Sequence, residues 1–352
     1  MTLRLSALEV RRKRFHLGPV DLCVPSGTFL SILGESGAGK STLLQTLAGL
    51  ITPDAGRIFL DGNDITDVPP EDRPSTFCQQ DSLLFPVFRV IDNLAFALVA
   101  KGMNRNQARE LAAKRAADFR IPRDLLSAWA ETVSGGEARR IALGRAFLKE
   151  DYRAAYLDEI TSNLDGENKR AVAKLTLDLF LESSSIFLFV CHEPALALEM
   201  ASAAISAGRH GLVAVMKAGK LLEMDAPQEI YLNPKSLYTA RLFGDVSVLD
   251  LDGRQELSSQ IFRAFPSPIE NCTVGVRPED AVFYAAEAPD GAFSVASRLL
   301  RTWFVGSVTK VEVETPCGNL IATAARQTNF APGTTGQISL SRLLFFRAGA
   351  NR

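Results

Sequence analysis

The sequence contains few of the residues that build metal centres and disulfide frameworks. It has three histidines and five cysteines in 352 residues, scattered along the chain and without a C-x-x-C pair. An odd number of dispersed cysteines indicates buried thiols in a reducing compartment, with neither disulfides nor a metal site. The histidines, at positions 16, 192 and 210, are too far apart in sequence to indicate a zinc site.

An excess of one charge and long apolar runs are also lacking. The chain has 39 basic and 40 acidic residues, a net charge of −1, which gives no overall attraction to nucleic acid or anionic lipid. No segment approaches the ~20 apolar residues that span a bilayer, and residues 1–15 lack the apolar core of a secretory signal. We interpret the basic run at 11–14 as an exposed turn between strands. We therefore expect a soluble, cytoplasmic protein that reaches a membrane only through a partner.

The most informative stretch present is residues 28–42, TFLSILGESGAGKST. Its order of apolar strand, G-x-x-x-x-G-K-[ST] and helix predicts a phosphate-binding loop. Glycines allow successive backbone N–H groups to turn inward, and the helix N-terminus adds positive charge there. We expect Lys40 to reach the β- and γ-phosphates and the Ser41 hydroxyl to ligate Mg²⁺. The expected nucleotide-binding residues of this loop are Gly34, Glu35, Ser36, Gly37, Ala38, Gly39, Lys40, Ser41 and Thr42. The loop alone does not separate this chain from kinases and GTPases.

The rest of the chain reads as two domains, as its length suggests. Apolar patterns predict strands at 3–10, 20–24, 29–33, 57–60, 75–78, 154–157 and 186–190. Helical patterns cover 40–50, 90–119 with a break at 101–102, 134–148 and 166–181. This alternation implies a parallel, helix-covered sheet that binds ligands past its strand ends. Beyond residue 238, short β-rich pieces separated by Gly and Pro turns predict a small barrel or sandwich.

Five further motifs follow the loop in a fixed order. They are Gln80 before an apolar loop, the VSGGE stretch 133–137 at a helix start, YLDE at 156–159, SNLD at 162–165, and His192 after the next strand. Over about residues 3–245 this order resembles the ATP-binding subunits of ATP-binding cassette (ABC) transporters. The Ser-Gly-Gly element excludes kinases and GTPases. The resemblance implies an α/β P-loop cassette, residues 1–240, with a mostly parallel sheet and a helical insert at about 86–134.

The resemblance also assigns roles around the bound Mg²⁺ and ATP. Asp158 would hold Mg²⁺ through water, and Glu159 would act as general base or orient the attacking water. Gln80 would contact the metal or the water and link the site to a transmembrane partner. His192 would contact the γ-phosphate. The chain would then be an ATPase.

Other nucleotide contacts follow from the same resemblance. Ser134, Gly135, Gly136 and Glu137 would face the ATP of a second subunit, so a head-to-tail homodimer is expected. Val133 and Glu137 replace the family's usual Leu and Gln, but the Ser-Gly-Gly core is kept. Ile160 replaces a usual Pro and should alter only a turn. Phe15 is the candidate for stacking on adenine, with Arg11 and Lys13 at competing alignments.

Residues 241–352 resemble the small all-β, oligonucleotide-binding-like (OB-like) domain of importer subunits, called TOBE, most clearly at 276–279. The implied role is to power import, at the cytoplasmic face of the inner membrane, through permease subunits fed by an extracytoplasmic solute-binding protein. Nucleic-acid binding is not expected. Two alternatives remain open: a soluble ABC ATPase outside transport, and a regulatory module that does not hydrolyse ATP. The sequence names neither the cargo nor a regulatory ligand.

Overall fold

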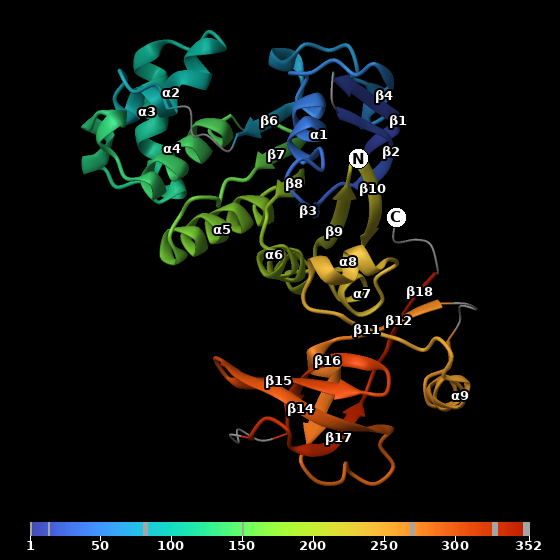
Figure 1. Ribbon diagram of the computed structural model, residues 1–352. Coiled ribbons are helices and arrows are strands. Elements are labelled where there is room, and N and C mark those ends of the chain that lie inside the picture. The colour runs from blue at the N-terminus through green and yellow to red at the C-terminus, as the bar shows by residue number, and fades with distance from the viewer. Residues whose placement is uncertain are drawn as a thin grey trace. The chain divides into compact units, whose positions relative to one another are not determined.

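The computed structural model describes residues 2–12, 15–79, 84–149, 151–267, 272–325 and 330–347. The chain divides into two compact units, Met1–Gln228 and Glu229–Arg352. Figure 1 shows the helices and strands of both units. The expected boundary after residue 240 falls inside helix α8 (Leu237–Leu242), in the second unit.

The first unit is built on a mostly parallel sheet. Its strands lie in the order β10 (Lys220–Asp225), β9 (His210–Lys217), β3 (Thr28–Leu33), β8 (Ile186–Val190), β7 (Ala154–Asp158) and β6 (Ser75–Cys78). β10 runs antiparallel to β9, and the other neighbours are parallel. Every residue of β3, β7 and β8 is buried, which explains why their sequences are mostly apolar. The predicted parallel sheet is present.

Helices cover both faces of this sheet. Leu30 and Ile32 of β3 belong to the same core as helix α1 (Lys40–Leu47). The alternate residue Ser31 donates a hydrogen bond to the carbonyl of Ala197 in α6 (Pro194–Ser206), at 3.0 Å. Phe29 packs on Phe180 of α5 (Gly166–Leu181). Because successive strand residues point to opposite faces, α1 covers one face while α5 and α6 cover the other.

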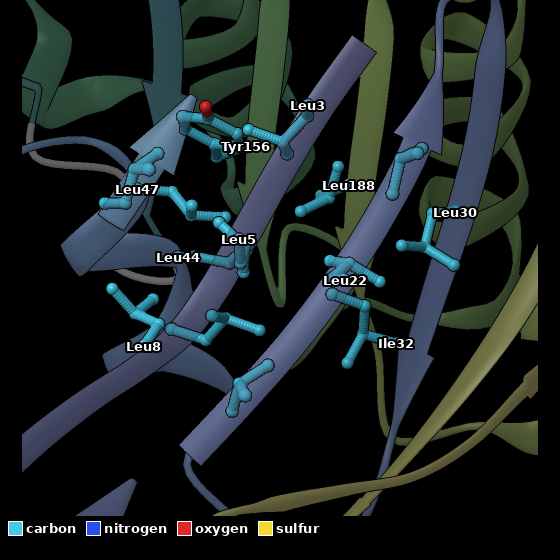
Figure 2. Close-up of a cluster of buried hydrophobic side chains, with 14 of the residues drawn as sticks. Leu3, Leu5, Leu8, Leu22, Leu30, Ile32, Leu44, Leu47, Tyr156 and Leu188 are labelled. Atoms are coloured by element: carbon cyan, nitrogen blue, oxygen red, sulfur yellow. The ribbon is translucent and has the colours of Figure 1, made fainter. Parts of the chain in front are cut away.

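A second, antiparallel sheet lies over α1. Its order is β2 (Phe15–Pro25), β1 (Thr2–Arg12), β4 (Ala55–Leu60) and β5 (Asn63–Asp64). One face of β1 contributes buried Leu3, Leu5, Leu8 and Val10, with a register shift between Leu5 and Leu8. Figure 2 shows these leucines meeting Leu44 and Leu47 of α1 and Leu188 of the parallel sheet. Truncating one such leucine to alanine costs about 2–5 kcal/mol.

A buried arginine fixes the far end of α1. Arg73 is 2% exposed, and its guanidinium donates to the carbonyls of Thr46 and Leu47 at 2.9 and 2.6 Å. It also donates to the carbonyls of Thr66 and Val68. The last carbonyls of a helix have no partner within it, so this clamp satisfies them and ties α1 to the segment leading into β6.

The expected helical insert contains α2 (Val90–Ala100) and α3 (Arg105–Arg115), which lie away from the sheets in Figure 1. α4 (Gly135–Phe147) begins just beyond the expected limit of residue 134 and connects the insert to the sheet, because Phe147 stacks on Phe187 of β8. The expected break near 101–102 is present, and Gly102 has φ 92°. Asp92 of α2 accepts two hydrogen bonds from Arg109 of α3, both at 2.8 Å. A third contact comes from Arg105 at 3.2 Å.

The second unit contains a β-barrel. Its closed order is β13 (Ala281–Tyr284), β16 (Gly318–Ala324), β15 (Val308–Thr315), β14 (Ser294–Val305) and β17 (Thr335–Leu340). A smaller sheet has the order β11 (Ser247–Leu249), β12 (Cys272–Val276) and β18 (Leu344–Arg347). Helices α7 (Pro227–Leu232), α8 and α9 (Gln255–Ala264) complete the described part. The predicted fold class is confirmed, although α9 was not foreseen.

Candidate functional site

The predicted phosphate-binding loop joins the buried end of β3 to α1. Gly39 has φ 100°, and a Cβ atom there would lie 2.6 Å from the ring of Phe15. Gly37 has φ 81°, and a Cβ atom there would project into open space. The loop therefore needs glycine at position 39, because the ring of Phe15 occupies the space of a Cβ atom and φ is positive. At position 37, glycine adopts the positive φ and leaves the concave side of the loop clear.

Lys40, the first residue of α1, is 4% exposed. Its Nζ donates to the carbonyls of Gly34 and Glu35, at 2.7 and 3.0 Å. Burial lowers its pKa, while the nearby carboxylates of Glu159 and Asp158 oppose that change. The loop thus holds the ammonium group of Lys40 at its open side. A bound anion there would offset the free-energy cost of burying this charge.

Asp158 is the last residue of β7 and contacts Ser41, the residue that follows Lys40 in α1. The Ser41 hydroxyl donates to Asp158 Oδ1 at 3.0 Å. Burial raises the pKa of Asp158, and the hydrogen bond from Ser41 acts in the opposite direction. The sequence separates these residues by 117 positions, and the parallel register of β3, β8 and β7 brings them together.

Glu159 and His192 follow neighbouring strands and contact each other. Glu159 N–H donates to the carbonyl of Val190, and His192 Nε2 is hydrogen-bonded to Glu159 Oε1. Glu159 has φ 49°, a left-handed conformation that is uncommon outside glycine. Its carbonyl accepts from the N–H and hydroxyl of Ser162, at 3.0 and 2.6 Å. This turn directs the carboxylate away from the strand axis and towards His192.

These groups surround one cavity of about 440 Å³. It is lined by Arg12, Phe15, Ser36, Gly37, Gly39, Lys40, Ser41, Thr42, Glu159 and His192. The structure therefore brings together the loop, the candidate base and Phe15. Arg12 was not singled out from the sequence. Gln80 lies outside the described residues, between the described ends at 79 and 84.

The Ser-Gly-Gly element begins α4 and forms a capping box. Ser134 N–H and its hydroxyl both donate to Glu137 Oε2 at 2.8 Å, and Glu137 N–H donates to Ser134 Oγ at 3.3 Å. A Cβ atom on Gly136 would lie 2.2 Å from Asn168 Oδ1 of α5. None of the described residues 134–137 lines the cavity at Lys40.

The site residues fit a magnesium nucleotide. The cavity contains a clear glycine-lined concavity and a buried ammonium group for phosphates. The Ser41 hydroxyl and the Asp158 carboxylate, which lie within hydrogen-bond distance of each other, would supply two oxygen ligands. Few protein ligands suit Mg²⁺, which keeps waters and binds substrate phosphates.

The sequence predicted buried cysteines and no segment that spans a membrane. Cys78, Cys191 and Cys317 are buried as expected, but Cys23 is exposed and Cys272 is partly so. In the parts of the chain that the structure covers, no helix is both long and apolar enough to traverse a bilayer.

The chain is similar to known proteins over most of its length. A family profile described as ABC transporter matches residues 17–162. The chain is 30% identical to the Fe(3+) ions import ATP-binding protein FbpC 1 of Haemophilus influenzae, over 77% of this chain and 81% of that protein. It is 35% identical to the molybdate/tungstate import ATP-binding protein WtpC of Thermococcus kodakarensis, over 80% and 83%. It is 31% identical to the spermidine/putrescine import ATP-binding protein PotA of Pseudomonas aeruginosa, over 93% and 92%.

A solved structure supports the fold independently. It is a dimeric, post-hydrolysis state of an ATP-binding cassette with ADP and phosphate bound. The match has a TM-score of 0.55 and 21% identity and covers 64% of this chain and 98% of that one. It supports the predicted cassette as a fold.

Proposed function

The chain belongs to the ABC transporter family, and on that premise we propose that it is the ATP-hydrolysing subunit that powers substrate import through a membrane permease. One observation carries the proposal. The buried ammonium of Lys40, the Ser41–Asp158 pair and the Glu159–His192 pair meet at one sheet edge. These are the groups that phosphoryl transfer to water requires.

Each group of site residues has a separate role in hydrolysis. The loop N–H groups and Lys40 bind the β- and γ-phosphates. Glu159 orients the attacking water and accepts its proton as the water oxygen bonds to the γ-phosphorus and the bond to ADP breaks. His192 holds the Glu159 carboxylate and, as a residue that lines the cavity, would contact the γ-phosphate. Ser41 and Asp158, with Gln80, would hold Mg²⁺, which supplies neutralising charge to the phosphates.

A second copy of the chain would complete each site. Ser134, Gly135 and Gly136 begin α4 outside the Lys40 cavity, so they need the ATP of a partner. The dimer would act at the cytoplasmic face of the inner membrane against permease subunits, which receive cargo from an extracytoplasmic solute-binding protein. Relatives named for iron(III), molybdate or tungstate, and spermidine or putrescine are similarly close, so cargo choice would lie with those partners.

The C-terminal domain would tune transport and take no part in ATP chemistry. The cavity residues all lie between 12 and 192, inside the first unit. The domain limits proposed from sequence are 1–240 and 241–352, and the closed barrel lies within the latter range.

The test is phosphate release by the chain with its permease in lipid vesicles. We expect ATP-dependent phosphate release that rises when loaded solute-binding protein is added. The Lys40→Ala variant is the matched control and should lose release, because its loop keeps no ammonium for phosphates. Hydrolysis without any association with a permease would favour a soluble ATPase, and no hydrolysis under any condition would favour a regulatory module.

A further inference from the structure

A short turn carries His192 from β8 into α6. The Cys191 N–H donates to the carbonyl of Ile32 in β3 at 3.4 Å, and the Cys191 thiol donates to the carbonyl of Glu193 at 3.6 Å. The residues on either side of His192 are thus attached to the fold, whereas its own side chain is 40% exposed. The direction of the imidazole therefore depends on how residues 191–193 are held.

Glu193 precedes the first turn of α6 but does not cap it. Among the described residues, its carboxylate accepts no hydrogen bond from the N–H groups at the start of the helix. Short polar side chains are preferred at this position because they accept such bonds. The Glu193 carboxylate instead pairs with the ammonium group of Lys169, in the first turn of α5. A side chain at a capping position is therefore used for a contact between two helices.

Lys169 is itself attached to the turn that carries Glu159. The Lys169 N–H donates at 2.9 Å to the carbonyl of Asp165, where the turn between β7 and α5 ends. The Lys169–Glu193 ion pair therefore connects the turn after β7 with the turn after β8. The Glu159–His192 hydrogen bond connects the same two turns.

The ion pair lies outside the nucleotide cavity. Lys169 and Glu193 line a groove of about 530 Å³ between α5 and α6, and their side chains are 27% and 52% exposed. Neither of these two described residues lines the cavity at Lys40. Within one subunit, the pair can thus affect hydrolysis only through the residues that it holds.

We propose that Lys169 and Glu193 are positioning residues for His192, and that their ion pair keeps its imidazole against the Glu159 carboxylate. This inference rests on the proposed function, in which Glu159 and His192 take part in hydrolysis. Without Lys169, the N-terminus of α6 attracts the Glu193 carboxylate, because the helix dipole favours negative charge there. The turn can then carry His192 away from Glu159, and small displacements of reacting groups slow catalysis.

Phosphate release by the full chain with its permease in lipid vesicles tests this role. We expect Lys169→Met to lower kcat about three- to fivefold, the size of effect that a partly exposed ion pair supports. The KM for ATP should stay within about twofold, because the loop and Lys40 are unchanged. Glu193→Gln should give the same loss, and Lys169→Arg, which keeps the charge, should retain most of the parental rate. Lys174→Met is the matched control and should match the parent, since Lys174 is exposed on α5 and lines the same groove but is not part of this pair.

A double-mutant cycle with His192 distinguishes positioning from a general structural role. If the ion pair acts through His192, Lys169→Met should have no further effect in a His192→Ala background. Single-turnover phosphate release, followed for hours so that slow rates are measured, gives the comparison. Thermal unfolding of each variant establishes that it is folded.

Four results overturn the positioning role while leaving the proposed function intact. They are a parental kcat in Lys169→Met, an equal loss in Lys169→Arg, an equal loss in Lys174→Met, and losses that multiply in the His192→Ala background. A parental chain that releases no phosphate overturns the proposed function, and the positioning role with it.

Discussion

Glu159 is held by its surroundings in a conformation that it would not adopt by preference. The turn carrying it has φ 49°, and Ser162 and Val190 secure its backbone by hydrogen bonds. Uncommon backbone conformations in ordinary residues cost roughly 1–3 kcal/mol and persist where neighbours impose them. The backbone thus sets where the Glu159 side chain leaves the chain, and the hydrogen bond with His192 holds its carboxylate.

Glu159→Gln should separate binding from hydrolysis. The amide keeps the size of the side chain but cannot accept the proton of water, so hydrolysis should fall about 10²–10⁴-fold. ATP affinity should persist, because Lys40 and the loop are unchanged. Single-turnover phosphate release and equilibrium binding measure the two effects. Hydrolysis at the parental rate would assign the base to another residue.

At the residue scale, motif spacing predicted most of the site. Lys40 was identified from the phosphate-loop motif. Asp158, Glu159 and His192 were identified from the family resemblance and from their places after parallel strands, which end at one sheet edge. Arg12 was missed because its place depends on the register of β1 with β2, which spacing along one strand does not reveal. The close approach of Asn168 to Gly136 was also missed, because it depends on how α5 packs against α4.

Among the elements, α4 depends on its capping box. Glu137→Ala removes the carboxylate that accepts from Ser134 and should cost about 1 kcal/mol of unfolding free energy. Glu137→Gln keeps an acceptor at the same place, so it should be nearly neutral. Urea unfolding of the two variants gives the comparison. Equal stability of both would show that the cap does not hold this helix.

The α2–α3 pair predicts a pH-dependent contribution to stability. The hydrogen bonds from Arg109 lower the pKa of Asp92, so the pair stabilises the folded state above the ordinary carboxyl pKa of about 4. That contribution is lost as pH falls through the lower, folded-state value. Arg109→Ala should therefore cost about 1 kcal/mol at pH 7 and less near pH 3. Arg105→Ala, which removes a longer and more exposed contact, is the control and should cost less. A cost that does not change with pH, measured by urea unfolding, would contradict an electrostatic role.

The sequence patterns predicted individual helices and strands better than they predicted how these elements assemble into sheets. The expected helix at 166–181 and strand at 186–190 have the observed bounds. Strands β9 and β10 were not predicted, nor was α9, although Leu257, Ile261 and Phe265 recur at helical spacing and pack on the core of the second unit. This helical spacing was overlooked because the sequence on both sides of α9 is rich in turns and short β-like segments. Separation of β1, β2 and β4 into their own sheet could not be read from strand sequences at all.

At the scale of the whole molecule, composite sites should allow complementation between damaged subunits. A mixed dimer of Lys40→Ala and Ser134→Arg chains has one intact site and one doubly damaged site, whereas either homodimer has two damaged sites. Mixing should therefore restore ATP-dependent dimerisation, measured by sedimentation. If mixtures behave as the average of the two homodimers, the head-to-tail arrangement is wrong.

The two-unit division predicts that a chain ending at Gln228 remains folded. It keeps the parallel sheet, including β9 and β10, and every described residue that lines the nucleotide cavity. We expect a cooperative thermal transition and ATP affinity close to that of the full chain. An insoluble product would show that the first unit needs the second to fold.

The position of β3 between β8 and β9 has a consequence for biosynthesis. Its two neighbours come from residues 186–217, so the strand that carries the phosphate loop emerges from the ribosome long before either partner exists. At typical synthesis rates that interval lasts on the order of 10–40 s. During it, six consecutive residues that are buried in the finished sheet have no strand to pair with. The pairing of β3, and with it the placement of the phosphate loop at its end, must therefore wait until Lys217 has been made.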